Sequence, residues 1–465
     1  MESTPSHPFL SGVIEGFYGK PWSTEERLEL FDWMAGAGLN TYLYGPKDDL
    51  RHRAIWRDCY PEAEARELAE LIRTCHGRGF EFFYALGPGL DIRFSDAGDR
   101  ESLKARFGQL IGMGCRHFCL LFDDIPDVMD PGDRARFGTF ASAQASVANE
   151  LFRWVRERVP GARFLFCPTP YCGRMAERQL GGPDYLGTIG RELLPDIGVF
   201  WTGPEIISRE ITLEHLQWLT GLLRRKPVLW DNLHANDYDG HRFYCGPYSG
   251  RPLEIRQAVD GILTNPNTEF AVNYVAVRTL GDYLRCDGTW NPRSAYCAAL
   301  REWGGRFETV GGPIPSDDLI LLLDSYYLPY ELGETAEAFW SLARRLLSTD
   351  PAGWGADRGA FLETAGRLRR CCARIAEVKH RPLFHAMSRR VWELREELDL
   401  LEKFVAFRAD PAHAACPFHS DFHLPETYRG GLVARLQHLL AQQPDGSFVA
   451  RRALDEAGNG GGHGS

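Results

Sequence analysis

The sequence predicts an α/β chain: a (β/α)8 TIM-type barrel followed by an all-α helical domain. Three observations lead to this fold class. Eight short β-rich runs alternate with helical patterns from residue 10 onward. The runs are almost continuously apolar, as in parallel strands that helices cover on the outside. The β pattern ends at a segment rich in Gly and Pro near residues 304–316, and helical patterns follow.

The eight runs define the predicted barrel strands in chain order. Alternation of strands with helical stretches is typical of a parallel sheet. A doubly wound open sheet has the same alternation, because the number of strands does not prove that the sheet closes. The runs are LSGVIEGF from residue 10, NTYLYG from 40, EFFYALG from 81, HFCLLFDD from 117, RFLFCPT from 163, IGVFWTG from 197, KPVLWDN from 226 and FAVNYVA from 270.

The C-terminal region has an apolar repeat with helical spacing, alternately three and four residues apart, which lays one stripe along a helix. This stripe is either the core seam of a helical bundle or a contact with a second subunit. Its members are Phe384, Met387, Val391, Leu394, Leu398, Leu401 and Val405. The predicted domains are residues 8–305 for the catalytic barrel, 306–316 for a linker, 317–445 for the helical domain and 446–465 for a flexible tail.

Composition and charge exclude several classes of function. The 465 residues are 44% hydrophobic and 25% charged, as in ordinary globular proteins. A net charge of −10 argues against nucleic-acid and membrane partners, because both need a concentrated basic face. The twelve cysteines lack the spacings of a disulfide scaffold or a zinc site, so we expect reduced thiols. No signal peptide is evident, and no apolar run approaches the ~20 residues of a membrane span, which predicts a cytoplasmic protein.

Polar and aromatic residues recur where the predicted strands end. In a (β/α)8 barrel these ends converge on one mouth, where catalytic residues are expected. Tyr18, Tyr171 and Trp230 can offer flat apolar surface to a sugar ring or an acyl group. The strand-end residues are Gly16, Phe17, Tyr18, Lys47, Asp48, Asp49, Asp123, Asp124, Tyr171, Trp230, Asp231, Asn232 and the loop LHANDYD at 233–239, with Asn265 just before the predicted eighth strand.

Two adjacent aspartates end the fourth run, in HFCLLFDDIPD at residues 117–127. Neighbouring strand residues can share one cleft only where the backbone turns, and Pro126 makes such an ending plausible. Close carboxylates repel, which raises the pKa of one and leaves it a proton to donate, while the other stays ionised. This division suits general acid catalysis beside an anionic stabiliser. The alternatives are a capping pair and a divalent-metal site that also uses Asp231 and Asp237.

Seven motifs together resemble, in order and spacing, the glycoside hydrolases called O-GlcNAcases, which form glycoside hydrolase family 84. The resemblance covers residues 10 to about 290 and continues more weakly in YYLPYELG, RRVWELREELDLL and YRGGL, which look like the stalk helices of the animal enzymes. The seven motifs are GVIEGFYGKPW, NTYLYGPKDD, LGPGLDIRFS, LLFDDI, FCPTPYCG, WDNLHANDYD and LTNPNTEF.

The resemblance implies removal of β-linked N-acetylglucosamine from serine or threonine of proteins by retaining hydrolysis. The substrate's own acetamido oxygen is then the nucleophile, and an oxazoline is the intermediate. Asp123 matches the residue that orients and polarises the acetamido nitrogen, and Asp124 matches the general acid and base. Such families depart from the usual covalent carboxylate nucleophile. No cofactor or metal is expected, because the substrate's amide replaces a metal-activated water.

The resemblance also implies a set of substrate-binding residues and a homodimer formed through the helical domain. Four residues match those that bond the sugar hydroxyls: Gly16, Lys47, Asp237 and Asn265. Asn232 matches a residue that positions the reacting groups. The residues that match the lining of the acetyl pocket are Cys167, Tyr171 and Trp230. Pro170 departs from the pattern, which has an acidic residue there, so the backbone before Tyr171 is expected to differ.

Two other functions compete with removal of N-acetylglucosamine from proteins. A β-hexosaminidase for free oligosaccharides, such as hyaluronan or chitin fragments, uses the same sugar pocket and differs only in the groove outside it. A non-catalytic sugar-binding barrel is disfavoured, because both Asp123 and Asp124 are present.

Overall fold

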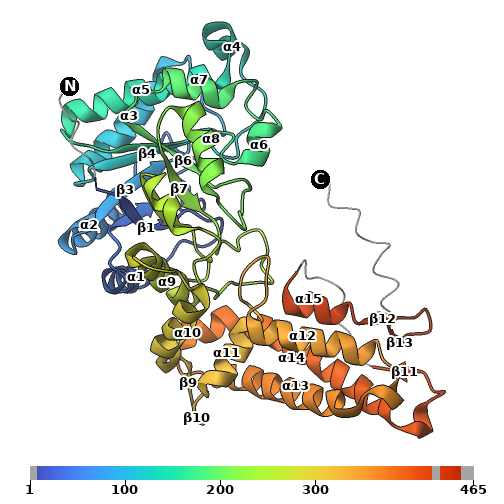
Figure 1. The fold of residues 1–465 in the computed structure, drawn as a ribbon. Helices are drawn as coiled ribbons and strands as arrows, with labels where there is room; N and C mark the ends of the chain where they lie inside the picture. The colour runs from blue at the N-terminus through green and yellow to red at the C-terminus, as the bar shows by residue number, and fades with distance from the viewer. Residues whose placement is uncertain (1–7, 421–429, 452–465) are drawn as a thin grey trace. The chain divides into compact units, whose positions relative to one another are not determined.

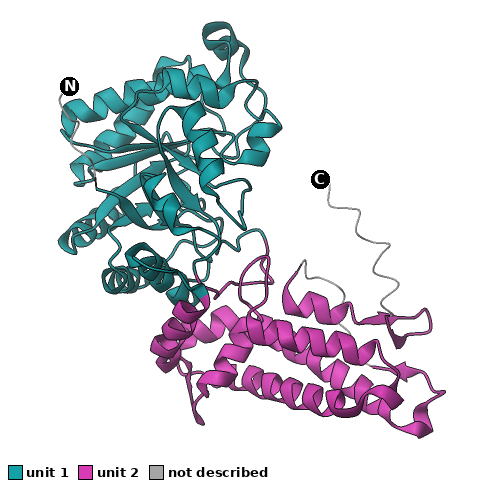
Figure 2. Ribbon diagram, viewed as in Figure 1, with its two compact units in different colours: residues 1–238, 248–292 teal, residues 239–247, 293–465 magenta. Residues whose placement is uncertain are grey.

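The computed structural model describes residues 8–420 and 430–451. The chain forms two compact units (Figure 2). Unit 1 consists of residues 1–238 and 248–292, and unit 2 of residues 239–247 and 293–465. The strands β1 to β8 and the helices around them belong to unit 1, and the helices α11 to α15 belong to unit 2 (Figure 1).

Unit 1 contains a closed barrel of eight parallel strands in the order β1 to β8. Strand β1 pairs in parallel with β2 on one side and with β8 on the other, so the sheet has no edge. The predicted barrel is therefore confirmed, and the open-sheet alternative is wrong. The strands are β1 Leu10–Glu15, β2 Thr41–Tyr44, β3 Glu81–Leu86, β4 His117–Leu121, β5 Phe164–Cys167, β6 Ile197–Trp201, β7 Pro227–Asp231 and β8 Gly261–Thr264.

Local sequence signals set the start and end of the first helix. At its start, the Ser23 side chain accepts a hydrogen bond from the Glu26 amide, and the Glu26 side chain accepts one from the Ser23 amide. Gly38 ends it with φ 70°. The helices of unit 1 are α1 Thr24–Ala37, α2 Glu62–Gly77, α3 Ala97–Gly112, α4 Pro131–Phe137, α5 Phe140–Arg158, α6 Gly173–Glu177, α7 Tyr185–Glu192, α8 Leu213–Leu223, α9 Tyr274–Arg285 and the 3-10 turns Leu253–Gln257 and Phe270–Val272.

The prediction of the eighth strand is wrong in position. Residues 270–276 form a 3-10 turn and the start of α9, and the strand is the four-residue run Gly261–Thr264. A short apolar run does not distinguish a buried helix from a strand, and FAVNYVA presents its apolar residues to the interior of the unit in helical form. Asn265 therefore follows β8 instead of preceding it, which places it at the same end of the barrel as the other strand-end residues.

Apolar side chains fill the interior of the barrel, so polar groups collect at its ends. The interior side chains come from every strand and interdigitate in layers, which makes the barrel a packed core rather than a channel. They include Leu10, Ile14, Leu43, Phe83, Ala85, Cys119, Leu121, Leu165, Cys167, Phe200, Val228, Trp230 and Leu263.

Unit 2 is built around long helices, as the sequence predicts, but it also contains short strands that the sequence analysis did not predict. A two-stranded hairpin of β9 and β10 lies in the segment predicted as a linker, and a three-stranded sheet has the order β11-β13-β12. Its elements are α10 Pro292–Trp303, the 3-10 turns Gly304–Phe307, Pro351–Gly353 and Pro411–His413, β9 Glu308–Thr309, β10 Gly312–Pro313, α11 Ser316–Asp324, α12 Glu334–Leu347, α13 Gly355–Ile375, α14 Arg381–Ala409, β11 Phe418–His419, α15 Gly431–Gln437, β12 Leu440–Gln442 and β13 Ser447–Ala450.

The predicted apolar stripe is the core side of α14. Met387, Val391, Leu394, Leu398, Leu401 and Val405 are all buried within the single chain. Helix α14 packs mainly against α13. The stripe is thus the internal seam of a helical bundle, and only Phe384 at its start remains partly exposed.

Part of the predicted tail is also ordered in the structure, because β13 covers residues 447–450, while residues 452–465 lie outside the described part of the chain. Within the described part, the helices offer no segment of the length and apolar character that crossing a membrane requires.

Candidate active site

The carboxyl ends of the barrel strands bring together most of the predicted site residues. All eight strands are parallel, so the residues that follow them lie at the same end. Hydrogen bonds and ion pairs connect the loops after β1, β2, β4 and β5 through one group of side chains, which we call the aspartate cluster. Its members are Tyr18, Lys47, Arg53, Asp123, Asp124 and Tyr171.

Asp124 stands at a turn of unusual backbone conformation. Its φ is 48°, in the left-handed region that residues other than Gly, Asn and Asp rarely adopt. The turn lets two neighbouring side chains lie in one cleft, as the sequence argument required. The Asp124 carboxylate accepts hydrogen bonds from the Tyr18 hydroxyl at 3.1 Å and the Tyr171 hydroxyl at 2.9 Å. Burial and the Asp124 charge raise the pKa of both phenols, so both keep the proton that they donate.

Asp123 is held by cations. The Lys47 ammonium donates to Asp123 Oδ2, and Arg53 Nη1 lies 3.8 Å from the same oxygen. Burial alone raises the pKa of Asp123, but the charges of Lys47 and Arg53 outweigh it and hold this pKa below its usual value. Mutual repulsion of the two aspartates therefore does not leave Asp123 protonated. Its Oδ1 is buried and accepts no hydrogen bond from the described residues.

Trp230 packs directly against the glycine that follows β1. A Cβ atom at Gly16 would lie 2.4 Å from Trp230 Cζ2 and 2.6 Å from Ile14 Cγ2, so the position has room only for glycine. The Lys47 ammonium lies 5.7 Å from the centre of the Trp230 ring, within the range of a cation–π contact. Trp230 thus joins the turn after β1 to the cation that holds Asp123.

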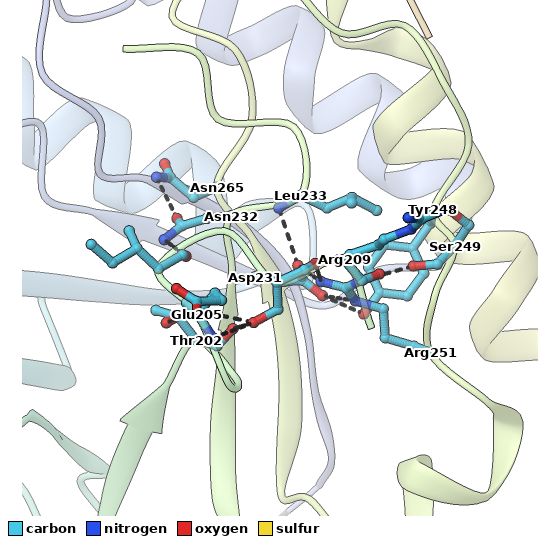
Figure 3. A network of polar contacts seen from close by, with 12 residues as sticks. Thr202, Glu205, Arg209, Asp231, Asn232, Leu233, Tyr248, Ser249, Arg251 and Asn265 are labelled. Carbon is cyan, nitrogen blue, oxygen red and sulfur yellow. Dashed lines mark hydrogen bonds and ion pairs between the residues drawn. The ribbon is translucent and has the colours of Figure 1, made fainter. Parts of the chain in front are cut away.

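Two asparagines from neighbouring strand ends form a hydrogen-bonded pair. Asn265 Nδ2 donates to Asn232 Oδ1 at 3.0 Å, and Asn232 Nδ2 donates to the Ile206 carbonyl at 2.9 Å (Figure 3). Asn265 Oδ1 is buried and has no hydrogen-bond partner among the described residues. The pair therefore leaves one amide oxygen able to accept a hydrogen bond from a ligand.

Asp237 connects the loop after β7 to the loop after β1. Its Oδ2 accepts a hydrogen bond from the Tyr18 backbone amide at 2.9 Å. Burial raises the pKa of Asp237, since the other nearby groups offset only part of this effect. The structure therefore places Asp237 beside the aspartate cluster, although it follows a different strand.

Pro170 leaves Tyr171 in a position to reach Asp124. The Tyr171 carbonyl accepts a hydrogen bond from the Thr202 amide at 2.9 Å, which anchors the backbone after the proline. Cys167, at the end of β5, is buried, and burial raises the pKa of its thiol well above the usual value. Cys167 is thus a neutral, apolar wall of the site.

Phe17, Asp48 and Asp49 follow strands but do not join the aspartate cluster, and Asp48 is exposed. Phe17 is buried and packs against Trp22, with ring centres 5.2 Å apart. Asp49 accepts hydrogen bonds from the Tyr44 hydroxyl at 2.7 Å and the Tyr60 hydroxyl at 2.6 Å. Phe17 and Asp49 therefore stabilise the loops through contacts with other aromatic residues.

Asp231 has a structural role, which removes it from the proposed metal site. Arg251 donates to both of its carboxylate oxygens at 2.7 Å, and Tyr248 donates its hydroxyl to Oδ2 at 2.8 Å (Figure 3). The Leu233 amide donates to Oδ1 at 3.1 Å. This fully buried ion pair fixes the chain on both sides of Asn232. Across residues 8–420 and 430–451, no three His, Cys, Asp or Glu side chains are grouped so that they could hold a metal ion.

Comparison with known proteins identifies the family. The family model described as beta-N-acetylglucosaminidase matches residues 11–310. The chain belongs to this family. It is 47% identical over 277 residues to protein O-GlcNAcase of Rattus norvegicus and, to the same extent, of Mus musculus. The alignment covers 60% of this chain but only 30% of each of these relatives. The resemblance seen in the sequence motifs is therefore confirmed.

A solved structure supports the same assignment over most of the chain. A mutant of the Thermobaculum terrenum O-GlcNAc hydrolase superposes with a TM-score of 0.73 at 28% identity. The match covers 86% of this chain and 82% of the other. The structural similarity between the two chains thus extends past the barrel into the C-terminal helices.

Two residues of the site, His52 and Arg53, are not among those predicted from the sequence. Arg53 Nη2 donates to the Asp124 carbonyl at 2.7 Å. His52 is buried with Nδ1 2.7 Å from the Ala85 carbonyl, and burial and the Lys47 charge lower its pKa to about 4, so it is neutral. The dense run of charges in PKDDLRHR after the second strand was the signal, because charged residues at a strand end are candidates for the site.

Proposed function

We propose that the chain hydrolyses the bond between N-acetylglucosamine and serine or threonine of proteins, with retention of configuration and with the substrate's acetamido oxygen as nucleophile. The observation that carries this proposal is the unequal environment of two adjacent aspartates. Cations hold Asp123 as an anion with one buried, unpaired oxygen, whereas two neutral phenols contact Asp124. One carboxylate thus suits a hydrogen bond from an amide, and the other suits proton transfer.

The first chemical step forms an oxazoline. The acetamido oxygen attacks the anomeric carbon and the bond to the serine or threonine oxygen breaks, while Asp124, which carries a proton in the reacting form of the enzyme, gives that proton to the departing oxygen. Asp123 accepts a hydrogen bond from the acetamido N–H, which makes the carbonyl oxygen a better nucleophile, and it takes this proton as the neutral oxazoline forms. In the second step, water attacks the anomeric carbon and gives a proton to Asp124. The bond between that carbon and the acetamido oxygen breaks, and Asp123 returns the proton to the nitrogen, which restores the acetamide.

The remaining site residues fit the recognition of one sugar. Asn265 Oδ1 is buried and unpaired, so a sugar hydroxyl can donate to it. We assign Gly16, Lys47 and Asp237 to further hydroxyls and Asn232 to the positioning of the reacting groups through its bond to Asn265. Tyr18 offers a partly exposed ring at the site's edge. Cys167, Tyr171 and Trp230, which belong to one buried cluster, form the walls of the proposed acetyl pocket.

Hydrolysis of aryl N-acetyl-β-glucosaminides tests the mechanism. Proton NMR should show the β-anomer of N-acetylglucosamine as the first product. Stepwise fluorination of the acetyl group weakens the carbonyl oxygen as a nucleophile, so kcat should fall steeply with each fluorine. An α-anomer as first product, or rates that fluorine leaves unchanged, would refute participation by the acetamide.

The choice of protein over free oligosaccharide rests on the names of the relatives, protein O-GlcNAcase and O-GlcNAc hydrolase. A direct comparison of kcat/KM on a glycosylated protein, chitin fragments and hyaluronan fragments tests it. We expect the glycosylated protein to be the best substrate. Preference for the free oligosaccharides would instead identify the chain as a β-hexosaminidase.

We also propose a homodimer formed by unit 2. The stripe on α14 is used inside the chain, but a separate groove lies on the outside of α13 and α14. Trp392 is exposed at this groove, and an exposed aromatic beside apolar neighbours is typical of protein contacts. The groove is lined by Cys372, Ala376, Phe384, Ser388, Arg389, Trp392, Glu393 and Glu396.

Light scattering tests the dimer. The wild-type chain should give about twice the 52.5 kDa chain mass. Trp392→Glu should give the monomer mass, and Ala406→Glu, at an exposed position of the same helix outside the groove, should leave the dimer intact. A wild-type monomer at micromolar concentration would refute the dimer.

A further inference from the structure

One guanidinium spans the two adjacent aspartates. Arg53 comes from the loop after β2 and is buried. Its Nη2 donates to the Asp124 carbonyl at 2.7 Å, while its Nη1 lies 3.8 Å from Asp123 Oδ2. The same guanidinium lies 5.9 Å from the centre of the Tyr18 ring. It thus contacts the backbone of one aspartate, the side chain of the other and a hydroxyl donor to Asp124.

We propose that Arg53 is a positioning residue that keeps the two aspartates in different roles: it fixes the turn that directs the Asp124 carboxyl, and it supplies the second cation that holds Asp123 as an anion. This inference deepens the proposed hydrolysis and rests on it for its kinetic readout.

The backbone at Asp124 needs such a partner. Its left-handed φ of 48° is uncommon even for aspartate, which adopts this region more readily than most residues, and contacts from the surroundings stabilise such a conformation. The Arg53 bond is made to the carbonyl of this same residue, so it fixes the peptide that follows the turn. If the turn relaxes, the carboxyl moves relative to Tyr18 and Tyr171. A displacement of about 1 Å at a catalytic group can reduce the rate by about 100-fold.

Arginine suits this position better than lysine does. Its planar group carries several N–H donors in a fixed geometry, so it can serve a carbonyl and a carboxylate at once. Lysine offers a compact charge, and Lys47 already donates to Asp123. Arg53→Lys therefore keeps a positive charge near Asp123 but loses the bridge to the Asp124 carbonyl. Arg53→Met loses both.

The charges around Asp123 determine how the loss of Arg53 would change the pKa of Asp123. Lys47 and Arg53 are the two cations that lower the pKa of Asp123 most, and the charge that His52 gains at low pH adds a smaller effect. Without Arg53, burial still disfavours the Asp123 anion, but one fewer cation stabilises it. The pKa of Asp123 therefore rises. The titratable groups that face Asp123 are Tyr18 after β1, Lys47, His52 and Arg53 after β2, Asp124 after β4, and Cys167 and Tyr171 at the end of β5.

The experiment measures kcat/KM against pH for two aryl N-acetyl-β-glucosaminides, one with a 4-nitrophenyl and one with a 4-methoxyphenyl leaving group. Arg53→Lys should lose at least about 10-fold more activity on the 4-methoxyphenyl substrate, because only that substrate depends strongly on proton donation by Asp124. Arg53→Met should lose activity on both substrates and move the acidic limb of the profile up by about one pH unit. Arg51→Lys and Arg51→Met are matched controls, because Arg51 lies in the same loop but bonds Glu64 and Cys59.

Equal losses of Arg53→Lys on both substrates, or an unmoved acidic limb in Arg53→Met, would overturn the inference. If Arg53→Met does not fold, as judged by circular dichroism, Arg53→Lys alone decides through its leaving-group ratio. A ¹³C NMR titration of the Asp123 carboxyl, assigned with Asp123→Asn, gives a second readout that needs no activity. An inactive wild-type chain would refute the proposed function, whereas a pKa of Asp123 that stays constant on loss of Arg53 would refute this inference.

Discussion

Replacement of Gly16 by alanine is a sharp test of how the site is built. The added Cβ would lie 2.4 Å and 2.8 Å from two atoms of the Trp230 indole and 2.6 Å from Ile14 Cγ2, all well inside the ~3.5 Å at which non-bonded carbon atoms normally pack. Trp230 and Ile14 are both buried, so neither can move freely. Overpacking of this kind costs about 1–3 kcal/mol of unfolding free energy, equivalent to a fall in Tm of roughly 2–5 °C for a unit of this size.

The same substitution should also lower activity, because the indole is the neighbour that must shift. A shift of about 1 Å in a site wall reduces the rate by about 100-fold. Differential scanning calorimetry measures the Tm, and an aryl glucosaminide assay measures kcat/KM. Gly36→Ala is the matched control: this exposed glycine lies within helix α1 and has nothing within 4 Å of the added atom, so alanine should stabilise the chain by about 1 kcal/mol. Gly16→Ala with wild-type Tm and wild-type kcat/KM would show that Gly16 and Trp230 are not packed as described.

Four further substitutions have distinct expected results. Asp124→Asn should lower kcat/KM by about 100-fold or more on poor leaving groups and far less on activated ones, whereas Asp123→Asn should lower it on both; equal losses for Asp124→Asn would count against it as the acid. Arg251→Met should destabilise the chain by about 3–5 kcal/mol in urea titrations, because Asp231 loses the cation that pairs with it in the core, and an unchanged midpoint would contradict that pairing. Leu398→Asp should unfold the helical unit, seen as loss of helical circular dichroism, and a well-folded monomer would show instead that the stripe only joins subunits.

Much of the architecture was predictable because strong local patterns carried it. Seven of the eight barrel strands were apolar runs long enough to recognise. The eighth strand, residues 261–264, is harder to recognise because the longer apolar run after Asn265 has the stronger β pattern, although that run folds as a 3-10 turn and the start of a helix. The apolar stripe on α14 was correctly predicted as one face of a helix. Only the packing of the folded chain shows that this face is buried within the chain itself.

The sequence by itself determined the barrel, the helical region, the family and the position of two aspartates at the end of the fourth strand. Tertiary structure decided how those aspartates differ. Repulsion between neighbours suggested one protonated carboxyl, but Lys47 and Arg53, brought from the loop after β2, lower the pKa of Asp123 instead. Likewise, Asp231 became a structural residue only when Arg251, twenty positions later, folded onto it. The physical reason is that a carboxylate's role depends on the charges within a few ångströms of it, and the fold, not the adjacent sequence, brings those charges there.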